Sequence, residues 1–492
     1  MVKVIIIAIF IGMQIAVGIY STKKIKNVDD FLLGGRKMGA WLSALAYGTS
    51  YFSAVIFIGY AGGIGWEMGT SAIWIGIGNA LFGSFLAWKV LAKRTRSITR
   101  ELDAKTMPEF FQKRYKCEAL KILSSILTFV FLVPYTASVY KGLGYLFAKL
   151  FGSMVTEHQA YIIAITIMAL ITVLYLVLGG YMATAMNNLI QGIIMIGGTI
   201  VIVIYVLNSP NVNGLSAGLQ SLNNVKEGLG TLIGPNPWKL LSLVLLTSFG
   251  VWGLPQMVHK FYAIKDDSAI KRGTIIATVF AAIIGVGAYF TGSFGHLFFS
   301  EIPNQMPDTI IPEMLFSLLP DVFLGIFMVL ILSASMSTLS SLVLVSSSSI
   351  TVDLIKGYVK PNMSEKKQIL LLRIFCVIFV LISVIIALTN NNTIVTLMNL
   401  SWGTLAGSLL GPYLLGIYSK RTNKTAAILG MLSGFTTMMT LVIINGMTYS
   451  TIAGCISMAT SVMVTLIGTF IFKDKEKYII QESTNEATVT GK

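Results

Sequence analysis

Residues 333–341 read Ser333-Ala-Ser-Met-Ser-Thr-Leu-Ser-Ser341, which places six hydroxyl groups within nine residues. This hydroxyl run lies inside an apolar segment, 319–350, that is long enough to cross a bilayer. A polar group in hydrocarbon costs free energy unless it finds a partner. A single Ser or Thr can bond back to its own helix, but a dense cluster indicates oxygens that face a cation, a polar solute or another helix.

The composition around the hydroxyl run is typical of a membrane protein. Of the 492 residues, 55% are hydrophobic and 12% are charged, whereas an ordinary soluble domain carries about 25% charged residues. Apolar windows of bilayer-spanning length recur along the chain, and they lack the charges that the outer face of a soluble helix would need. We therefore predict an all-α polytopic membrane protein.

We predict about thirteen transmembrane helices, at residues 2–20, 40–64, 69–92, 119–150, 158–179, 183–207, 237–262, 273–299, 319–350, 368–388, 394–418, 424–445 and 449–472. The first could be read as a signal peptide. However, a basic run follows it and no small-residue cleavage site does, so we retain it as a span.

Positive charge alternates between the connecting segments and predicts the orientation. The basic segments contain five, eight, four, five, three and four Lys or Arg, at 21–37, 93–118, 260–272, 353–373, 419–424 and 473–492. Between them, 208–236 contains only Lys226, and 389–393 and 446–450 contain none. With thirteen spans, all basic segments fall on one side. This predicts a plasma-membrane protein with its N-terminus outside and its C-terminus in the cytoplasm, and it explains the net charge of +15 without nucleic acid.

The sequence contains no recognisable catalytic or metal-cluster motif. The three cysteines and three histidines lie far apart without metal-ligand spacing. No Asp or Glu lies securely at mid-membrane depth, which disfavours a carboxylate proton relay. We therefore expect that the protein is not an enzyme.

Two groups of five spans, the second to sixth and the seventh to eleventh, indicate an internal symmetry. Because five is odd, the groups would have opposite orientations, as in inverted-repeat transporters. The first span of each group is interrupted, in one by Gly48-Thr49-Ser50 and Gly59, Gly62, Gly63 and Gly65, and in the other by Gly250-Val-Trp-Gly253-Leu-Pro255. Such breaks expose carbonyls and helix ends to a solute at mid-membrane depth; alternatively, the glycines only allow close helix packing.

Hydroxyl and carbonyl oxygens are hard ligands suited to hard cations, so the hydroxyl run opposite a broken helix favours ion coordination. Lys141 is the one cation that we place well inside a predicted span. It either faces the solute, where it would attract a carboxylate, or extends its amine to the outer interface. Tyr135, Trp252, Gln256 and Trp402 lie on spans that would surround the site and are candidates for solute contact.

Four motifs resemble the sodium:solute symporter family, and most closely its bacterial proline/pantothenate symporter branch. They are Asp29-Asp-Phe-Leu-Leu-Gly-Gly-Arg36; Tyr175-Leu-Val-Leu-Gly-Gly-Tyr-Met-Ala183 followed by Gln191; Ala334-Ser-Met-Ser-Thr-Leu-Ser340 continuing to Asp353; and Gly411-Pro412 with Lys420-Arg421 and Gly430. The resemblance implies a five-plus-five inverted-repeat core with broken first and sixth core helices. The expected divisions are 1–37 (an extra helix and loop), 38–207 (first repeat), 208–236 (extracellular loop), 237–418 (second repeat), 419–472 (two further helices) and 473–492 (cytoplasmic tail).

The resemblance also implies the site residues. The sodium ligands would come from Thr49, Phe52, Ala334, Ser337 and Thr338, and the neighbouring solute contacts from Ser50, Tyr51, Ser53, Tyr135, Lys141, Trp252, Gln256 and Trp402. We expect Ser335 and Ser340 of the hydroxyl run to pack or to bond within their own helix.

Two departures from the family pattern bear on the solute and on the stoichiometry. The proline symporters carry an Asp where this chain has Tyr51, and many members carry an Asp where it has Asn188. In some members the latter Asp supports a second sodium site, so its absence favours one sodium per cycle.

The function expected from the resemblance is sodium-coupled symport of a small organic solute, an amino acid or a carboxylate, into the cell by alternating access. The alternative is a proton-coupled or ion-independent transporter of the same fold, with Lys141 supplying the charge. Sodium ion, the solute and the lipid bilayer are the expected partners, and no nucleic acid is expected.

Overall fold

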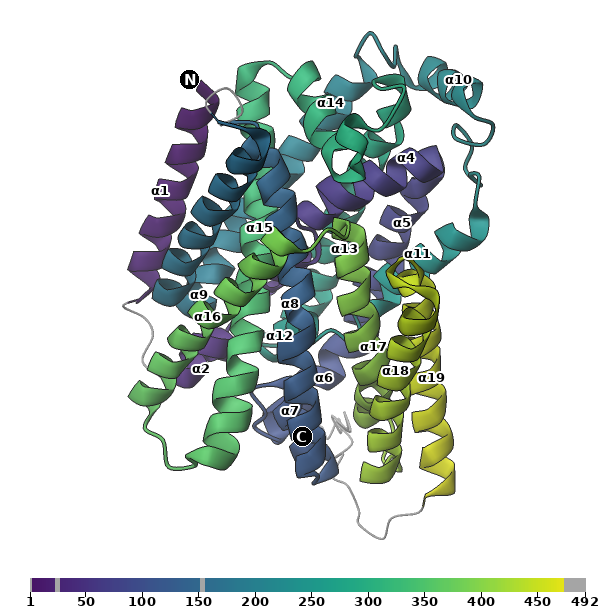
Figure 1. The fold of residues 1–492 in the computed structure, drawn as a ribbon. Coiled ribbons are helices and arrows are strands. Elements are labelled where there is room, and N and C mark those ends of the chain that lie inside the picture. Colours follow the sequence, from purple (N-terminus) through teal and green to yellow (C-terminus); the bar gives the residue numbers. More distant parts are fainter. Residues whose placement is uncertain (1, 23–26, 151–154, 473–492) are drawn as a thin grey trace, which may run out of the picture.

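The computed structural model describes residues 2–22, 27–150 and 155–472, without the side chains of 21–22, 175–180, 182 and 183. Within this part of the chain the protein is a bundle of helices, and β-structure is limited to one bridging pair, Met38 and Ile264. Figure 1 shows the long helices standing side by side. We call the end at which α1 begins the upper end and the opposite end the lower end.

The long helices are α1 (Val2–Thr22), α8 (Glu118–Ala148), α9 (Glu157–Leu207), α13 (Asp267–Ser293), α15 (Asp321–Ser348), α16 (Glu365–Thr389), α17 (Ile394–Tyr418), α18 (Lys424–Asn445) and α19 (Ser450–Ile471). The shorter helices are α2 (Val28–Leu33), η1 (Gly34–Arg36), α3 (Ala40–Tyr51), η2 (Val55–Ile64), α4 (Gly65–Met68), η3 (Gly69–Ala72), α5 (Ile73–Gly78), η4 (Asn79–Leu86), η5 (Trp88–Ala92), α6 (Lys93–Glu101), α7 (Met107–Tyr115), α10 (Leu215–Val225), α11 (Pro237–Gly250), α12 (Pro255–Tyr262), α14 (Ile310–Leu318) and η9 (Ser349–Val359).

Among the described residues, twelve helical stretches are long and apolar enough to cross a membrane. One of them, Val55–Glu101, has 47 residues, whereas a bilayer needs about 20. The chain changes direction within it at Gly69, whose φ is 58°. This stretch therefore holds the end of the span predicted at 40–64 and all of that at 69–92. The spans predicted at 158–179 and 183–207 both lie in α9, whose two apolar parts are Glu157–Leu174 and Thr184–Leu207.

Two helices are broken, as the sequence predicted. Helix α3 ends at Tyr51, and the next residue, Phe52, is extended, with φ −104° and ψ 121°. Helix α11 ends at Gly250, and α12 begins at Pro255 after an extended Leu254. Pro at the first position of a helix loses no intrahelical hydrogen bond, which explains why α12 begins there.

The glycines of the first broken helix allow close packing and do not themselves break it. Gly48 lies within α3, where an added Cβ would be 2.4 Å from Cδ1 of Phe280. Gly65 faces Gly292 of α13, and a Cβ on Gly292 would be 1.7 Å from the carbonyl oxygen of Ala61. The alternative of close helix packing thus holds for these positions.

The helices form two packed groups that meet at the broken helix. In one group, α13 packs on α3, α5 and η4, and α11 packs on α5 and η4. In the other, α8, α9, α15 and α16 pack on one another. Helix α3 contacts α9 and α15, so the end of α3 lies where the two groups face each other.

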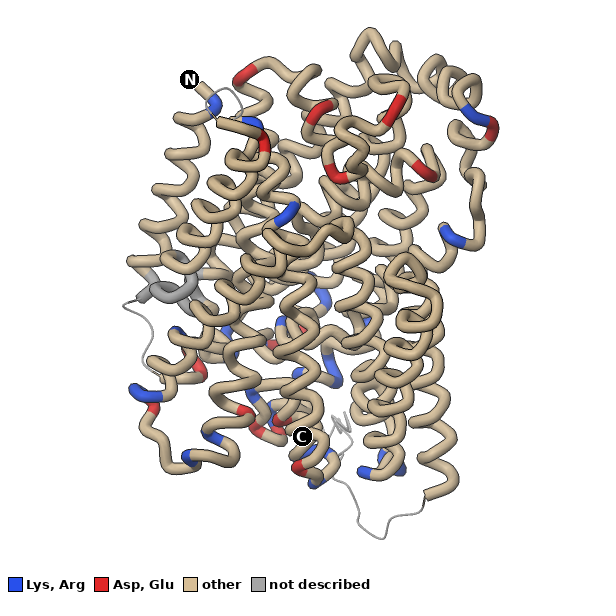
Figure 2. The backbone as a smooth tube through the Cα atoms, in the orientation of Figure 1, with Lys and Arg blue, Asp and Glu red and all other residues tan. Residues whose placement is uncertain are grey.

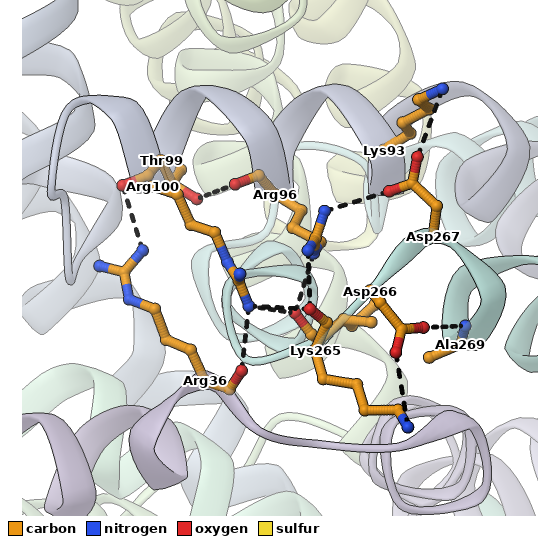
Figure 3. A network of polar contacts seen from close by, with 10 residues as sticks. Arg36, Lys93, Arg96, Thr99, Arg100, Lys265, Asp266, Asp267 and Ala269 are labelled. Atoms are coloured by element: carbon orange, nitrogen blue, oxygen red, sulfur yellow. Dashed lines mark hydrogen bonds and ion pairs between the residues drawn. The ribbon is translucent and has the colours of Figure 1, made fainter. Parts of the chain in front are cut away.

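Basic residues concentrate at the lower end of the bundle, as Figure 2 shows. Here Arg96 and Arg100 of α6 donate to the carbonyl oxygens of Ile264 and Lys265, over distances of 2.7 to 3.2 Å (Figure 3). Arg100 also donates to the carbonyl oxygen of Arg36, at 3.0 Å. The segment before α3 and the segment after α12 are therefore fastened to the same helix.

Candidate sodium and solute site

The early end of α3 leaves two backbone carbonyl groups available. A helix has no intrahelical N–H partners for the carbonyls of its last turn. In α3 these include the carbonyls of Thr49 and Ser50, because the helix ends at Tyr51. Both carbonyls face the hydroxyl run of α15.

The hydroxyl groups of Ser337 and Thr338 meet these carbonyls. Ser337 Oγ lies 2.6 Å from the carbonyl oxygen of Thr49 and 2.8 Å from that of Ala334. Thr338 Oγ1 lies 3.2 Å from the carbonyl oxygen of Ser50 and 3.1 Å from that of Ala334. All five residues are buried, with exposed fractions of 2% or less.

This cluster contains more acceptors than protons. Each hydroxyl has one proton to donate, and each carbonyl can only accept. The carbonyl of Ala334 lies inside α15 and already has a helical N–H partner, so the two hydroxyl protons suffice for the two carbonyls at the end of α3. Even so, five buried oxygens meet here, and their lone pairs outnumber the two protons. A surplus of buried oxygen acceptors is what a hard cation requires of its ligands.

The structure thus brings together four of the five residues predicted as sodium ligands: Thr49, Ala334, Ser337 and Thr338. The fifth, Phe52, lies in the break itself, where its N–H donates to the carbonyl of Gly48, at 3.2 Å.

Ser335 and Ser340 differ in their roles. Ser340 Oγ donates to Met336 within α15, at 2.6 Å, so the prediction that it bonds within its own helix is confirmed. Ser335 is fully buried, as the packing alternative predicted, but its Oγ bonds outside its own helix, where it accepts the N–H of Ala54, at 3.2 Å. The reason is that Ala54 follows the break in the first core helix, so its N–H has lost the helical partner that a continuous α3 would provide.

Lys260 is a buried cation that the sequence analysis did not assign to the site. Its Nζ donates to Ser341 Oγ, at 2.7 Å, and only 2% of the residue is exposed. It belongs to α12 and not to a basic loop, so Lys141 is not the only cation inside a span. The sequence contains the information needed to place Lys260 in the membrane, because the span predicted at 237–262 includes it.

Three predicted solute contacts form an aromatic cluster beside the break. The ring of Trp402 lies 6.0 Å from that of Tyr51 and 5.8 Å from that of Tyr135, between ring centroids. Among the described residues, the indole N–H of Trp402 and both amide atoms of Gln256 are buried without a hydrogen-bond partner. These groups are suited to meet a polar solute.

Other predicted solute contacts already have protein partners. The hydroxyl of Tyr51 donates to the carbonyl of Thr247, at 2.6 Å. The indole of Trp252 donates to the carbonyl of Phe82, at 3.0 Å. Ser53 Oγ accepts the N–H of Val55, at 3.2 Å. The Oγ atoms of Ser50 and Ser341 lie 2.8 Å apart.

Lys141 lies apart from the hydroxyl run, in the upper part of the bundle. Its Nζ donates to the carbonyls of Asn390 and Asn392, at 2.9 and 2.5 Å. Together with Asp308 and Tyr161 it lines a cavity of about 1120 Å³. The structure therefore associates Lys141 with this cavity and with the start of α17.

Asp308 is a second buried charge at this cavity. Its Oδ2 accepts the N–H of Ile394, the first residue of α17, at 3.1 Å. Burial raises the pKa of the Asp308 carboxyl to about 6, while the Ile394 N–H and the ammonium of Lys141 act in the opposite direction.

The model of the sodium:solute symporter family matches residues 31–434. The chain belongs to this family. The osmoregulated proline transporter OpuE of Bacillus subtilis is 29% identical over 484 residues, with 94% of each chain covered. The sodium/proline symporter of Staphylococcus aureus is 30% identical over 447 residues, covering 87% of this chain and 84% of the relative.

Solved structures share the fold. A sodium-coupled sialic acid symporter in a substrate-bound, outward-open state superposes with a TM-score of 0.78 at 17% identity, covering 97% of this chain and 99% of the other. MHP1, a nucleobase-cation-symport-1 family transporter in a closed conformation, superposes with a TM-score of 0.56 at 14% identity, covering 89% and 92%.

Family membership confirms the predicted fold class and makes sodium the co-substrate of a small-molecule solute. The chain is a multi-pass membrane transporter rather than an enzyme. The sodium ligands and solute contacts assigned above remain predictions.

Proposed function

We propose that this transporter couples inward movement of one sodium ion to uptake of a small amino acid, with proline as the first candidate. The observation that carries the proposal is the surplus of buried oxygen acceptors between α3 and α15. A sodium ion there would bind the lone pairs that remain on the five converging oxygens, those of the Thr49, Ser50 and Ala334 carbonyls and of the Ser337 and Thr338 hydroxyls.

Sodium would also act as the structural link of the outward-facing state. Its ligands come from two helices that belong to different packed groups, α3 and α15. Loss of the ion at the lower end would weaken this contact and release the solute. One cation crossing a potential of 100 mV supplies about 2.3 kcal/mol, or roughly 50-fold accumulation of solute, before any sodium gradient is added.

The aromatic cluster supports a compact amino acid as the solute. The faces of Tyr51, Tyr135 and Trp402 can pack on an apolar ring, and the unpaired N–H groups of Trp402 and Gln256 can donate to a carboxylate. Proline combines these two features. The names of the relatives, a proline transporter and a sodium/proline symporter, point to the same solute.

For the route, we propose an extracellular upper end and a cytoplasmic lower end in the plasma membrane. The concentration of Lys and Arg at the lower end supports this orientation. Lys141 would then lie in the upper cavity, on the approach of a carboxylate from outside. The repeats at 38–207 and 237–418 would rock against each other, and the contacts of α6 in Figure 3 would keep α3 and α12 moving together.

Uptake of labelled L-proline into proteoliposomes tests the proposal. We expect accumulation when an inward sodium gradient is imposed, and none when potassium replaces sodium on both sides. Proline uptake that is indifferent to this replacement would contradict the coupling. If a sodium gradient drives uptake of another amino acid but not of proline, only the choice of solute is wrong.

A further inference from the structure

The ammonium of Lys260 is buried beside the hydroxyl run, without a counter-ion among the residues that the structure describes. None of the ion pairs between described residues involves it. A buried charge normally requires compensation by hydrogen bonds or a partner charge. Lys260 instead donates to Ser341 Oγ, at 2.7 Å, and its Nζ lies 5.2 Å from the ring centroid of Tyr181.

Ser341 connects this ammonium to the candidate sodium site. Its Oγ is 2.8 Å from Ser50 Oγ and 3.0 Å from the carbonyl of Ser337. Because Ser341 Oγ accepts a hydrogen bond from Lys260, its own proton is free to bridge to α3 or to the preceding turn of α15. Three helices, α3, α12 and α15, therefore meet at one hydroxyl directly beside the sodium ligands.

Further polar atoms without partners lie on α9, which packs on both α3 and α15. Gly198 of α9 packs on Leu330 of α15, and Tyr181 lies beside Lys260, which contacts Ser341. Asn187 and Asn188 lie on α9 between these two contacts. Both amide atoms of each Asn are buried without a hydrogen-bond partner among the described residues.

We propose that Lys260 is a tethered cation that occupies the polar space beside Ser341 and Ser50, next to the candidate sodium ligands. The contact between α3 and α15 then binds one sodium ion and not two. This inference rests on the sodium site of the proposed function and adds a residue that sets the ion count. The ammonium bridges α12 to the α3–α15 contact, as a bound cation would. Its charge lies about one helical turn, roughly 5–6 Å, below the sodium ligands, and therefore weakens sodium binding.

Two substitutions separate the charge of Lys260 from its volume. Lys260→Met keeps the volume and removes the charge, so we expect one bound sodium ion with a dissociation constant lower by on the order of tenfold. Lys260→Ala also opens space beside the oxygens of Ser341 and Ser50, so we expect two bound sodium ions. Lys260→Arg keeps the charge and should bind one ion with near wild-type affinity.

The test is equilibrium binding of radioactive sodium to the purified full-length protein in detergent, with the ion number and affinity measured for each variant. Lys121→Met is the matched control, because Lys121 is also a buried lysine but contacts the ring of Tyr358, away from the hydroxyl run. It should bind sodium as the wild type does. A thermal unfolding scan confirms that each variant is folded.

The outcomes distinguish this inference from the proposed function. If Lys260→Met and Lys260→Ala, both folded, bind the same number of ions with the same affinity as the wild type, Lys260 is not the second cation. If the wild type itself binds two sodium ions, the inference is also wrong while the sodium site stands. If the wild type binds no sodium, both are wrong.

Discussion

Replacing Thr338 by Val removes one hydroxyl from the α3–α15 contact while keeping the branched shape of the side chain. Thr338 Oγ1 lies 3.1 to 3.4 Å from three carbonyl oxygens, those of Ala334, Ser50 and Thr49. Removing a buried partner and leaving the opposite group unsatisfied costs about 1–3 kcal/mol. Because sodium is proposed to bind this oxygen, the cost falls on the sodium-bound state. The half-saturating sodium concentration should therefore rise roughly 5- to 150-fold.

The assay is initial-rate uptake of L-proline into proteoliposomes over a range of sodium concentrations. Ser340→Ala is the matched control, because Ser340 is equally buried but bonds within α15, to the carbonyl of Met336. It should leave the half-saturating sodium concentration within about twofold of wild type. If Thr338→Val and Ser340→Ala give the same sodium curve, the assigned ligand set is wrong.

Three further predictions concern packing, protonation and solute binding. Gly292→Ala should lower the unfolding temperature, since its Cβ would lie 1.7 Å from the Ala61 carbonyl oxygen and overpacking costs about 1–3 kcal/mol. Gly197→Ala should leave it unchanged, because nothing lies within 4 Å of the added Cβ. Equal unfolding temperatures of the two variants would contradict this packing. Because burial raises the pKa of Asp308 to about 6, its stabilising contribution is present below its ordinary pKa and is lost as the pH rises through about 6. The unfolding temperature of the wild type, measured relative to that of Asp308→Asn, should therefore fall as the pH rises through about 6. A difference that does not change with pH would refute the raised pKa of Asp308. Trp402→Phe should raise the KM for proline about 10- to 100-fold with sodium binding in the absence of proline unchanged; an unchanged KM would remove Trp402 from the solute site.

The hydroxyl run and the second break could be predicted because their physics is local. Six hydroxyls in an apolar helix need partners wherever the helix is placed. A Pro that follows glycines ends a helix regardless of its neighbours, which is why α12 begins at Pro255.

The first break was assigned to the right helix but not to the right residues. Nothing in Phe52-Ser53 marks the end of a helix, and Gly48, the apparent signal, lies within α3. The break depends on tertiary contacts, such as that between the N–H of Ala54 and Ser335 Oγ. Such contacts join residues about 280 positions apart, beyond the reach of local patterns.

Charged residues were the least predictable part of the site. Lys141 and Lys260 both lie within predicted spans, but their partners, the carbonyls of Asn390 and Asn392 and the hydroxyl of Ser341, come from distant helices. A lysine side chain is long and flexible, so its position in the sequence does not fix where its ammonium lies.

The central claim is that a sodium ion binds where α3 ends against α15. Equilibrium binding of radioactive sodium to the purified protein tests it most directly, by comparing wild type with a variant carrying both Ser337→Ala and Thr338→Val. We expect saturable binding by the wild type and none by the folded double variant at the same concentrations. Equal binding by both proteins would place the sodium site elsewhere.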